Sequence, residues 1–218
     1  MTELRLTLGE NDTDVSIDIA IVAGWTGRDR DAVEKHMAEL EAVGVPRPSS
    51  APVFYRVSAS RLTTAPAIES TDSSSGEVEP VLLGHGGGLW VGAGSDHTDR
   101  EVETYSVAVS KQLCDKPIAR EFWRYEDVAE HWDELVLRSW IDGGVLYQEG
   151  ALSGLMKPAD LAAQAEPQLA DGTLMFCGTL AAIGGIRPAR EFRYELADPV
   201  LDRKISGHYE MYTLPLVS

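Results

Sequence analysis

The sequence predicts an α+β fold in a single domain, residues 1–218, that is predominantly β with a few peripheral helices. Three observations support this prediction. Short segments of branched apolar and aromatic residues, separated by glycine, proline and serine, recur along the chain. Only three segments space their apolar residues as helices do. The 218 residues contain no internal repeat and no long linker, and one domain accommodates that length.

The first third of the chain predicts two strands and one helix. Residues 15–21 alternate branched apolar with small or polar residues, as a half-buried strand does. Residues 29–43 place apolar residues on one helical face, and Gly44 with Pro46 supplies the stop. Residues 53–57 form a short aromatic strand.

The rest of the chain predicts more strands and two further helices. Composition makes residues 70–75 a loop and residues 84–88 a turn. Strands are expected at residues 89–94 and 102–109, helices at 124–140 and 158–165, and strands with turns from residue 172 onward.

Composition excludes several classes of function. Lys and Arg number 19 against 35 Asp and Glu, and the net charge of −16 repels nucleic acid and anionic membranes. No apolar run approaches the roughly 20 residues of a membrane helix, and the start does not resemble a secretory signal. We therefore expect a cytoplasmic protein. Cys114 and Cys177 lack metal-ligand spacing and are expected to be free thiols.

The pair Glu77-Val78-Glu79 is the clearest candidate site. A strand sends alternate side chains to one face, so both carboxylates would point the same way and need a cation to compensate them. Asp96 follows Glu79 by 17 residues, which suits a strand, a turn and a return strand. Three oxygen ligands suit Mg²⁺ or Mn²⁺. On spacing alone, a solvated strand edge explains the pair equally well.

Four motifs in order resemble the fumarylacetoacetate hydrolase superfamily, in particular a bacterial branch of unassigned function, over about residues 50–200. They are Glu77-Val78-Glu79, Ser95-Asp96-His97-Thr98-Asp99-Arg100-Glu101, Lys111, and the segment at 171–180 that contains Gly178-Thr179. The resemblance implies Glu77, Glu79 and Asp96 as metal ligands. It also matches Arg100 and Lys111 to the family's arginine and lysine.

The resemblance implies a β-roll of mixed sheets, usually dimeric, in which Mg²⁺ or Mn²⁺ holds a 2-oxo-acid or 1,3-dicarbonyl group. A small-molecule carboxylate, such as an acylpyruvate, would be the substrate. Arg100 and Lys111 would add positive charge near the developing oxyanion, and Gly178 and Thr179 would orient a substrate carboxylate. Tyr55 and Arg56, on the strand at residues 53–57, are further candidates for substrate contacts.

The histidines depart from the family pattern. Hydrolytic members activate water with a histidine upstream of the Glu-x-Glu pair, whereas residues 44–76 contain none. His85, in the glycine-rich turn, is the candidate general base, and His97 is expected to orient a neighbour. We expect His36, His131 and His208 to be surface or packing residues. A C–C bond hydrolase, a lyase, hydratase or isomerase, and a non-catalytic protein that retains the fold all stay open.

Overall fold

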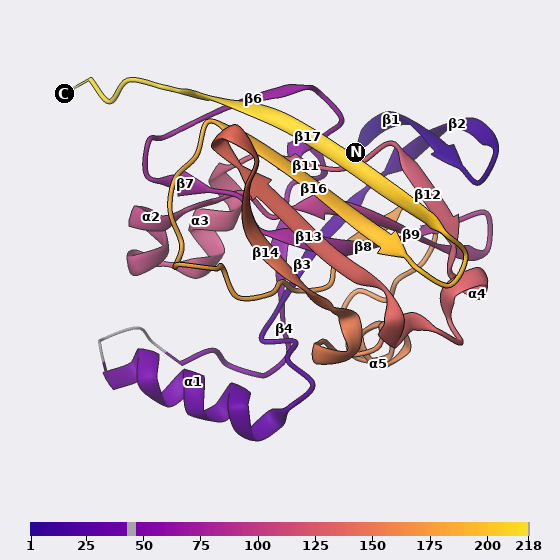
Figure 1. Cartoon of the computed structure of the whole chain (residues 1–218), viewed down its shortest axis with the longest axis horizontal. Coiled ribbons are helices and arrows are strands. Elements are labelled where there is room, and N and C mark those ends of the chain that lie inside the picture. The colour runs from indigo at the N-terminus through magenta and orange to yellow at the C-terminus, as the bar shows by residue number, and fades with distance from the viewer. Residues whose placement is uncertain (43–46, 218) are drawn as a thin grey trace.

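The computed structural model describes residues 1–42 and 47–217, and two β-sheets dominate it (Figure 1). The larger sheet is mixed and has eight strands in the order β2-β1-β12-β9-β8-β15-β3-β4. Its strands are β1 (Thr2–Leu8), β2 (Asn11–Ile17), β3 (Ile19–Gly24), β4 (Val53–Val57), β8 (Val78–His85), β9 (Gly88–Ser95), β12 (Glu121–Arg124) and β15 (Thr173–Phe176).

The smaller sheet has five strands in the order β14-β13-β16-β17-β6. They are β6 (Ala67–Ser70), β13 (Val136–Ile141), β14 (Val145–Ala151), β16 (Glu191–Asp198) and β17 (Arg203–Thr213). Two short pairs complete the strands. They are β7 (Ser74–Ser75) with β10 (Thr98–Asp99), and β5 (Leu62–Thr63) with β11 (Lys116–Pro117).

Helices lie around the sheets, and α1 extends away from them between β3 and β4 (Figure 1). The α-helices are α1 (Arg30–Ala42), α2 (Arg100–Tyr105), α3 (Val107–Leu113), α4 (Tyr125–Val128) and α5 (Pro158–Gln164). The 3-10 helices are η1 (Ala59–Arg61), η2 (Trp132–Glu134), η3 (Asp142–Gly144) and η4 (Leu152–Gly154). Within the described residues, no helix is long and apolar enough to cross a membrane.

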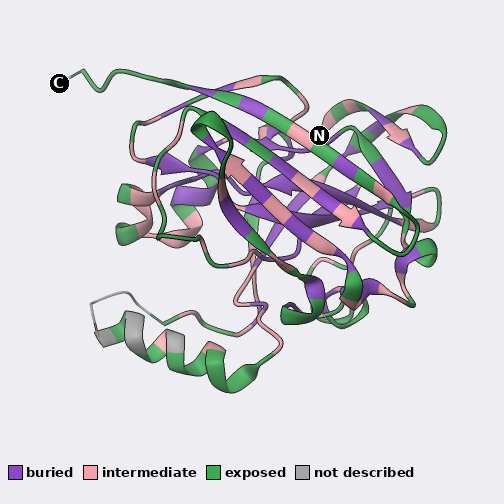
Figure 2. Ribbon diagram, in the orientation of Figure 1, coloured by how far each residue is buried: buried purple, intermediate pink, exposed green. Residues whose placement is uncertain are grey.

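The larger sheet is buried on both faces. On β8, Leu82 belongs to an apolar cluster shared with the five-stranded sheet, whereas Val81 and Leu83 belong to a second cluster that includes Phe122 and Phe176. Alternate side chains of a strand point to opposite faces, so each face of β8 contributes to a different core. The buried ribbons of Figure 2 follow these central strands. A predominantly β, α+β fold with peripheral helices is thereby confirmed.

Several predicted elements agree with the structure. The strand at residues 53–57 is β4, and the helix at 158–165 is α5. The turn at 84–88 joins β8 to β9, with Gly86 and Gly87 at positive φ. The predicted end of the first helix falls on residues 43–46, outside the described part of the chain.

Three predictions were wrong in part or entirely. The strand expected at 102–109 is instead the two helices α2 and α3. The helix expected at 124–140 is a short α4, a 3-10 turn and then strand β13. The strand expected at 15–21 is divided between β2 and β3, because the chain switches from the edge of the larger sheet to its interior at Asp18.

Candidate metal centre

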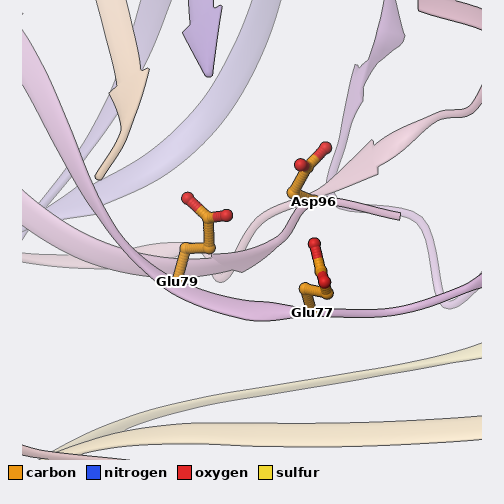
Figure 3. A group of neighbouring side chains, drawn as sticks. All are labelled: Glu77, Glu79 and Asp96. Carbon is orange, nitrogen blue, oxygen red and sulfur yellow. The ribbon is translucent and has the colours of Figure 1, made fainter. Parts of the chain in front are cut away.

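Glu77, Glu79 and Asp96 converge at one end of the β8–β9 hairpin (Figure 3). Each offers an oxygen, and these atoms all lie within 4.8 Å of one another. The hairpin register pairs Val78 with Ser95, and the Asp96 backbone N–H donates to the Glu77 carbonyl at 2.9 Å. Glu77 precedes β8 and Asp96 follows β9, so the strand, turn and return strand inferred from spacing does bring the three carboxylates together.

Glu79 and Asp96 are buried and Glu77 is partly buried, and the pKa values of the three carboxylates shift in different directions. Glu79 is 2% exposed and Asp96 is fully buried. Burial raises the pKa of Glu77, and it raises the pKa of Glu79 well above its usual range. Burial also opposes ionisation of Asp96, but the ammonium groups of Lys111 and Lys116 outweigh it and hold the pKa of Asp96 well below its ordinary value.

Three cations surround the cluster. Lys111, on α3, pairs with Asp96 Oδ2, and Lys116, on β11, lies 3.0 Å from Asp96 Oδ1. Arg100, at the start of α2, is 3.1 Å from Glu77 Oε1. Arg100 and Lys111, both chosen from the sequence, therefore do lie at the carboxylates. A charged group here would bind the carboxylate or the developing oxyanion of a substrate.

Gly178 positions Glu79. Its backbone N–H donates to Glu79 Oε2 at 2.7 Å. Gly178 has a φ of +99°, and a Cβ built on it would lie 1.8 Å from Thr26 Oγ1, so only glycine fits. The Thr179 hydroxyl is used internally, because it donates to the Val78 carbonyl at 2.7 Å. Gly178 and Thr179 thus lie at the cluster, where their visible contacts are with the protein.

A buried polar network surrounds His97, the residue after Asp96. His97 Nδ1 lies 2.9 Å from the Tyr209 hydroxyl, and Nε2 lies 2.8 Å from Ser74 Oγ. The same hydroxyl is 2.9 Å from Ser95 Oγ. Burial lowers the pKa of His97 to about 3, so its imidazole is neutral at physiological pH. His97 lies between β9 and β10 and links side chains of β17 and β7.

The two candidates on β4, Tyr55 and Arg56, lie on opposite faces of the strand. Lys111 Nζ lies 5.9 Å from the centroid of the Tyr55 ring, which places Tyr55 beside the cluster. Arg56 is exposed and follows Tyr55 directly on the strand, so its side chain leaves from the opposite face. The structure brings Tyr55 to the carboxylates and does not bring Arg56 there.

His85 lies far from the carboxylates within this chain. It ends β8, six residues beyond Glu79, a separation of about 20 Å along a strand. A general base must lie within hydrogen-bonding reach of the proton that it removes. His131 is 3.0 Å from Asp198 Oδ1, and His208 is exposed on β17. The structure thus does not place His85 where the sequence-based hypothesis needs it.

Sequence reasoning missed Lys116, which is fully buried and contacts both Asp96 and the His97 carbonyl. The signal for Lys116 in the sequence is a second lysine five residues after Lys111, soon after the acidic run. Thr26, Gln148 and Tyr209 were also missed, since they come from elements remote in sequence. Gln148 accepts from the Val78 N–H at 3.0 Å and donates to Thr179 Oγ1 at 2.8 Å.

The donor set fits a divalent cation. Three carboxylates converge, and Asp96 Oδ1 is buried without a well-directed hydrogen bond, although Lys116 lies 3.0 Å away. Such an atom retains a lone pair for a metal. A cavity of about 440 Å³ lies elsewhere, lined by residues such as Thr7, Arg120 and His208, and none of the carboxylates lines it.

The fold that carries this carboxylate cluster is shared with solved structures of known enzymes. Among the solved structures that match the chain is one from Burkholderia cenocepacia, provisionally described as a fumarylpyruvate hydrolase, with a TM-score of 0.65 and 15% identity over 99% of this chain and 97% of the other. A 2-keto-3-deoxy-D-arabinonate dehydratase complexed with magnesium and 2,5-dioxopentanoate matches with a TM-score of 0.62 and 13% identity over 91% of this chain and 75% of the other. A fumarylacetoacetate hydrolase from Exiguobacterium antarcticum matches with a TM-score of 0.61 and 16% identity over 94% of this chain and 79% of the other. The chain therefore has the fold of these three structures, a fumarylacetoacetate hydrolase among them.

Within that fold, the chain belongs to a family described as "Protein of unknown function (DUF2848)", whose model matches residues 23–209. No curated protein matches the chain. The family description assigns no reaction, so the activity has to be argued from the site.

Proposed function

We propose that the protein is a divalent-metal-dependent enzyme that acts on a small 2-oxo-acid or 1,3-dicarbonyl, such as an acylpyruvate, and hydrolyses a C–C bond. The convergence of Glu77, Glu79 and Asp96 among buried cations carries the proposal. The dehydratase of this fold is complexed with magnesium, which supports Mg²⁺ or Mn²⁺ as the ion.

Each group near the cluster has a chemical task in this proposal. Glu77, Glu79 and Asp96 would hold the ion, which when bound supplies Lewis-acid stabilisation of an enolate oxygen. Arg100 and Lys111 would bind the substrate carboxylate and stabilise negative charge that develops beside it. The Gly178 N–H keeps Glu79 oriented, and burial excludes competing water from this end of the hairpin.

A lyase, hydratase or isomerase reaction is the second candidate. The dehydratase structure shares the fold, and His85, the sequence-based candidate for water activation, lies at the other end of β8. Reaction in ¹⁸O-labelled water separates the two candidates. Hydrolysis places the label in a product carboxylate, whereas a lyase that adds no water leaves the carboxylates unlabelled.

Metal binding tests the proposal directly. Purified protein should bind about one Mn²⁺ per chain, as counted from the free-Mn²⁺ electron paramagnetic resonance signal. Glu77→Gln with Glu79→Gln should abolish binding and leave the circular dichroism spectrum unchanged. The matched control is Glu191→Gln with Glu210→Gln, a paired position on β16 and β17 that removes the same charge. Unchanged Mn²⁺ affinity in the first double variant would refute the proposed site.

Metal retention without turnover of any 2-oxo-acid or diketo-acid would instead indicate a non-catalytic protein that keeps the fold. We further propose that the protein is cytoplasmic and, as the resemblance implies, a homodimer. Sedimentation equilibrium of the purified chain gives its mass, and a monomer at micromolar concentration would contradict the dimer.

A further inference from the structure

Trp25 has an unusual backbone conformation directly after β3. Its φ is +59°, and within the described residues only Trp25 and Asp202 combine a positive φ with a side chain larger than glycine's. A bulky residue rarely adopts this region, and it persists there only when its surroundings impose the conformation. Contacts on both sides of Trp25 show what imposes it.

The first contact is with Tyr55. The Trp25 side chain hydrogen-bonds to the Tyr55 hydroxyl, and the indole N–H is its one donor. The Tyr55 ring packs against Gly24, since a Cβ built on Gly24 would lie 3.0 Å from a ring carbon. Lys111 Nζ lies 5.9 Å from the ring centroid and pairs with Asp96. Trp25 thus reaches the metal centre through Tyr55 and Lys111.

The second contact is through the next residue, Thr26. Its hydroxyl fills the space that a Cβ on Gly178 would take, and the Gly178 N–H donates to Glu79. Thr26 is 3% exposed, whereas Trp25 retains partial exposure. Thr26 therefore holds the segment beside Gly178, and the half-buried Trp25 directly precedes it.

We propose that Trp25 and Tyr55 form an aromatic wall beside the metal centre that binds a flat, unsaturated or aryl substituent of the oxo-acid. This inference rests on the proposed function and adds the class of substituent. Arg100, Lys111 and the metal would take the charged end of such a substrate. The Tyr55 ring lies between Gly24 and the Lys111 ammonium group, and aromatic faces stack on flat conjugated groups.

Two variants test the aromatic wall without disturbing the backbone at residue 25. Trp25→Gly removes the indole, and glycine adopts a φ of +59° without strain, so the backbone is retained. Trp25→Phe keeps a ring but loses the hydrogen bond to Tyr55. The control is Trp140→Phe, on β13 in the smaller sheet, which removes a tryptophan away from the carboxylates.

Calorimetric titration of the Mn²⁺-saturated protein supplies the affinities of three probes. They are oxalate, 2-oxobutanoate and phenylpyruvate, none of which has the 1,3-dicarbonyl group that the proposed hydrolysis cleaves. Trp25→Gly should weaken binding of the phenyl compound by about tenfold or more, the scale of a lost apolar pocket contact, while oxalate changes less than about twofold. Trp25→Phe should lie between the wild type and Trp25→Gly, and Trp140→Phe should match the wild type. The phenyl compound should quench tryptophan emission in the wild type and clearly less in Trp25→Phe.

The outcomes distinguish this inference from the function on which it rests. If the wild type binds neither Mn²⁺ nor oxalate, the proposed function fails and the wall fails with it. If both bind normally and Trp25→Gly retains wild-type affinity for the phenyl compound, the wall alone is refuted. Equal losses for oxalate and the phenyl compound in Trp25→Gly would also overturn it, because they would show a general disturbance of the metal centre.

Discussion

Replacement of Gly178 by alanine should damage both the fold and the metal centre. The residue has a φ of +99°, and the added methyl group would lie 1.8 Å from Thr26 Oγ1. The backbone conformation costs an L-residue about 1–2 kcal/mol, and forcing a methyl into a packed site costs about 1–3 kcal/mol. We therefore expect Gly178→Ala to lower the free energy of unfolding by about 2–5 kcal/mol.

Gly185→Ala is the matched control. Gly185 has a φ of +85°, and nothing lies within 4 Å of the position that its Cβ would occupy. It should lose only the backbone cost, about 1–2 kcal/mol. Thr26→Ala combined with Gly178→Ala should recover part of the loss, because it removes the nearest atom and leaves a Cβ contact of 3.0 Å.

Urea unfolding of the metal-free proteins at pH 7 measures these differences. Mn²⁺ titration of the same samples adds a second readout, since any shift of the Gly178 N–H also moves its acceptor, Glu79. A loss in Gly178→Ala no larger than that in Gly185→Ala would refute the reasoning. It would mean that Thr26 moves aside at little cost and does not fix residue 178.

Two further predictions concern the same region. Mn²⁺ at 100 times its dissociation constant should raise the free energy of unfolding by about 2.7 kcal/mol, which corresponds to a rise in melting temperature of about 5–10 °C. Scanning calorimetry of the double variant Glu77→Gln, Glu79→Gln should show no such rise. The pKa of His97 in the folded protein, about 3, lies below the unfolded value of about 6.5. The contribution of neutral His97 to stability is therefore complete above about pH 6.5 and is lost as the pH falls toward 3. Urea titrations of His97→Gln should show a smaller loss of stability between pH 7 and 5 than those of the wild type.

The cluster of three carboxylates was predictable because its members are close in sequence. Glu77, Glu79 and Asp96 belong to one hairpin, and period-two alternation together with a glycine-rich turn fixes how they meet. Lys116 and Gly178 depend on pairings between remote elements, β11 with β5 and β15 with β8, which spacing does not reveal. Sequence reasoning therefore found the carboxylates and missed part of what holds them.

The wrong helix and strand predictions have local causes. Valines at 102, 107 and 109 favour a strand, but Asp99 accepts from the Val102 N–H at 2.9 Å and Ser106 accepts from the Val109 N–H, so each caps a helix. In residues 124–140, the helical spacing of apolar residues coincides with the short helices α4 and η2, which end before Leu135. From Val136 onward the chain pairs with β16, and its side chains alternate between more and less buried. Capping side chains and sheet pairing overrode the periodic pattern in these two cases.

The charges of the metal centre suggest how an ion and a substrate would bind together. Lys111, Lys116 and Arg100 already pair with Asp96 and Glu77, and the raised pKa of Glu79 favours its protonated form. An entering dication would displace that proton and leave surplus positive charge in a buried site, which an anionic substrate offsets. Mn²⁺ affinity should therefore rise in the presence of oxalate and stay unchanged with neutral pentane-2,4-dione, as paramagnetic resonance titrations can measure. Equal enhancement by both compounds would show that chelation alone, without charge compensation by Arg100 and the lysines, governs binding.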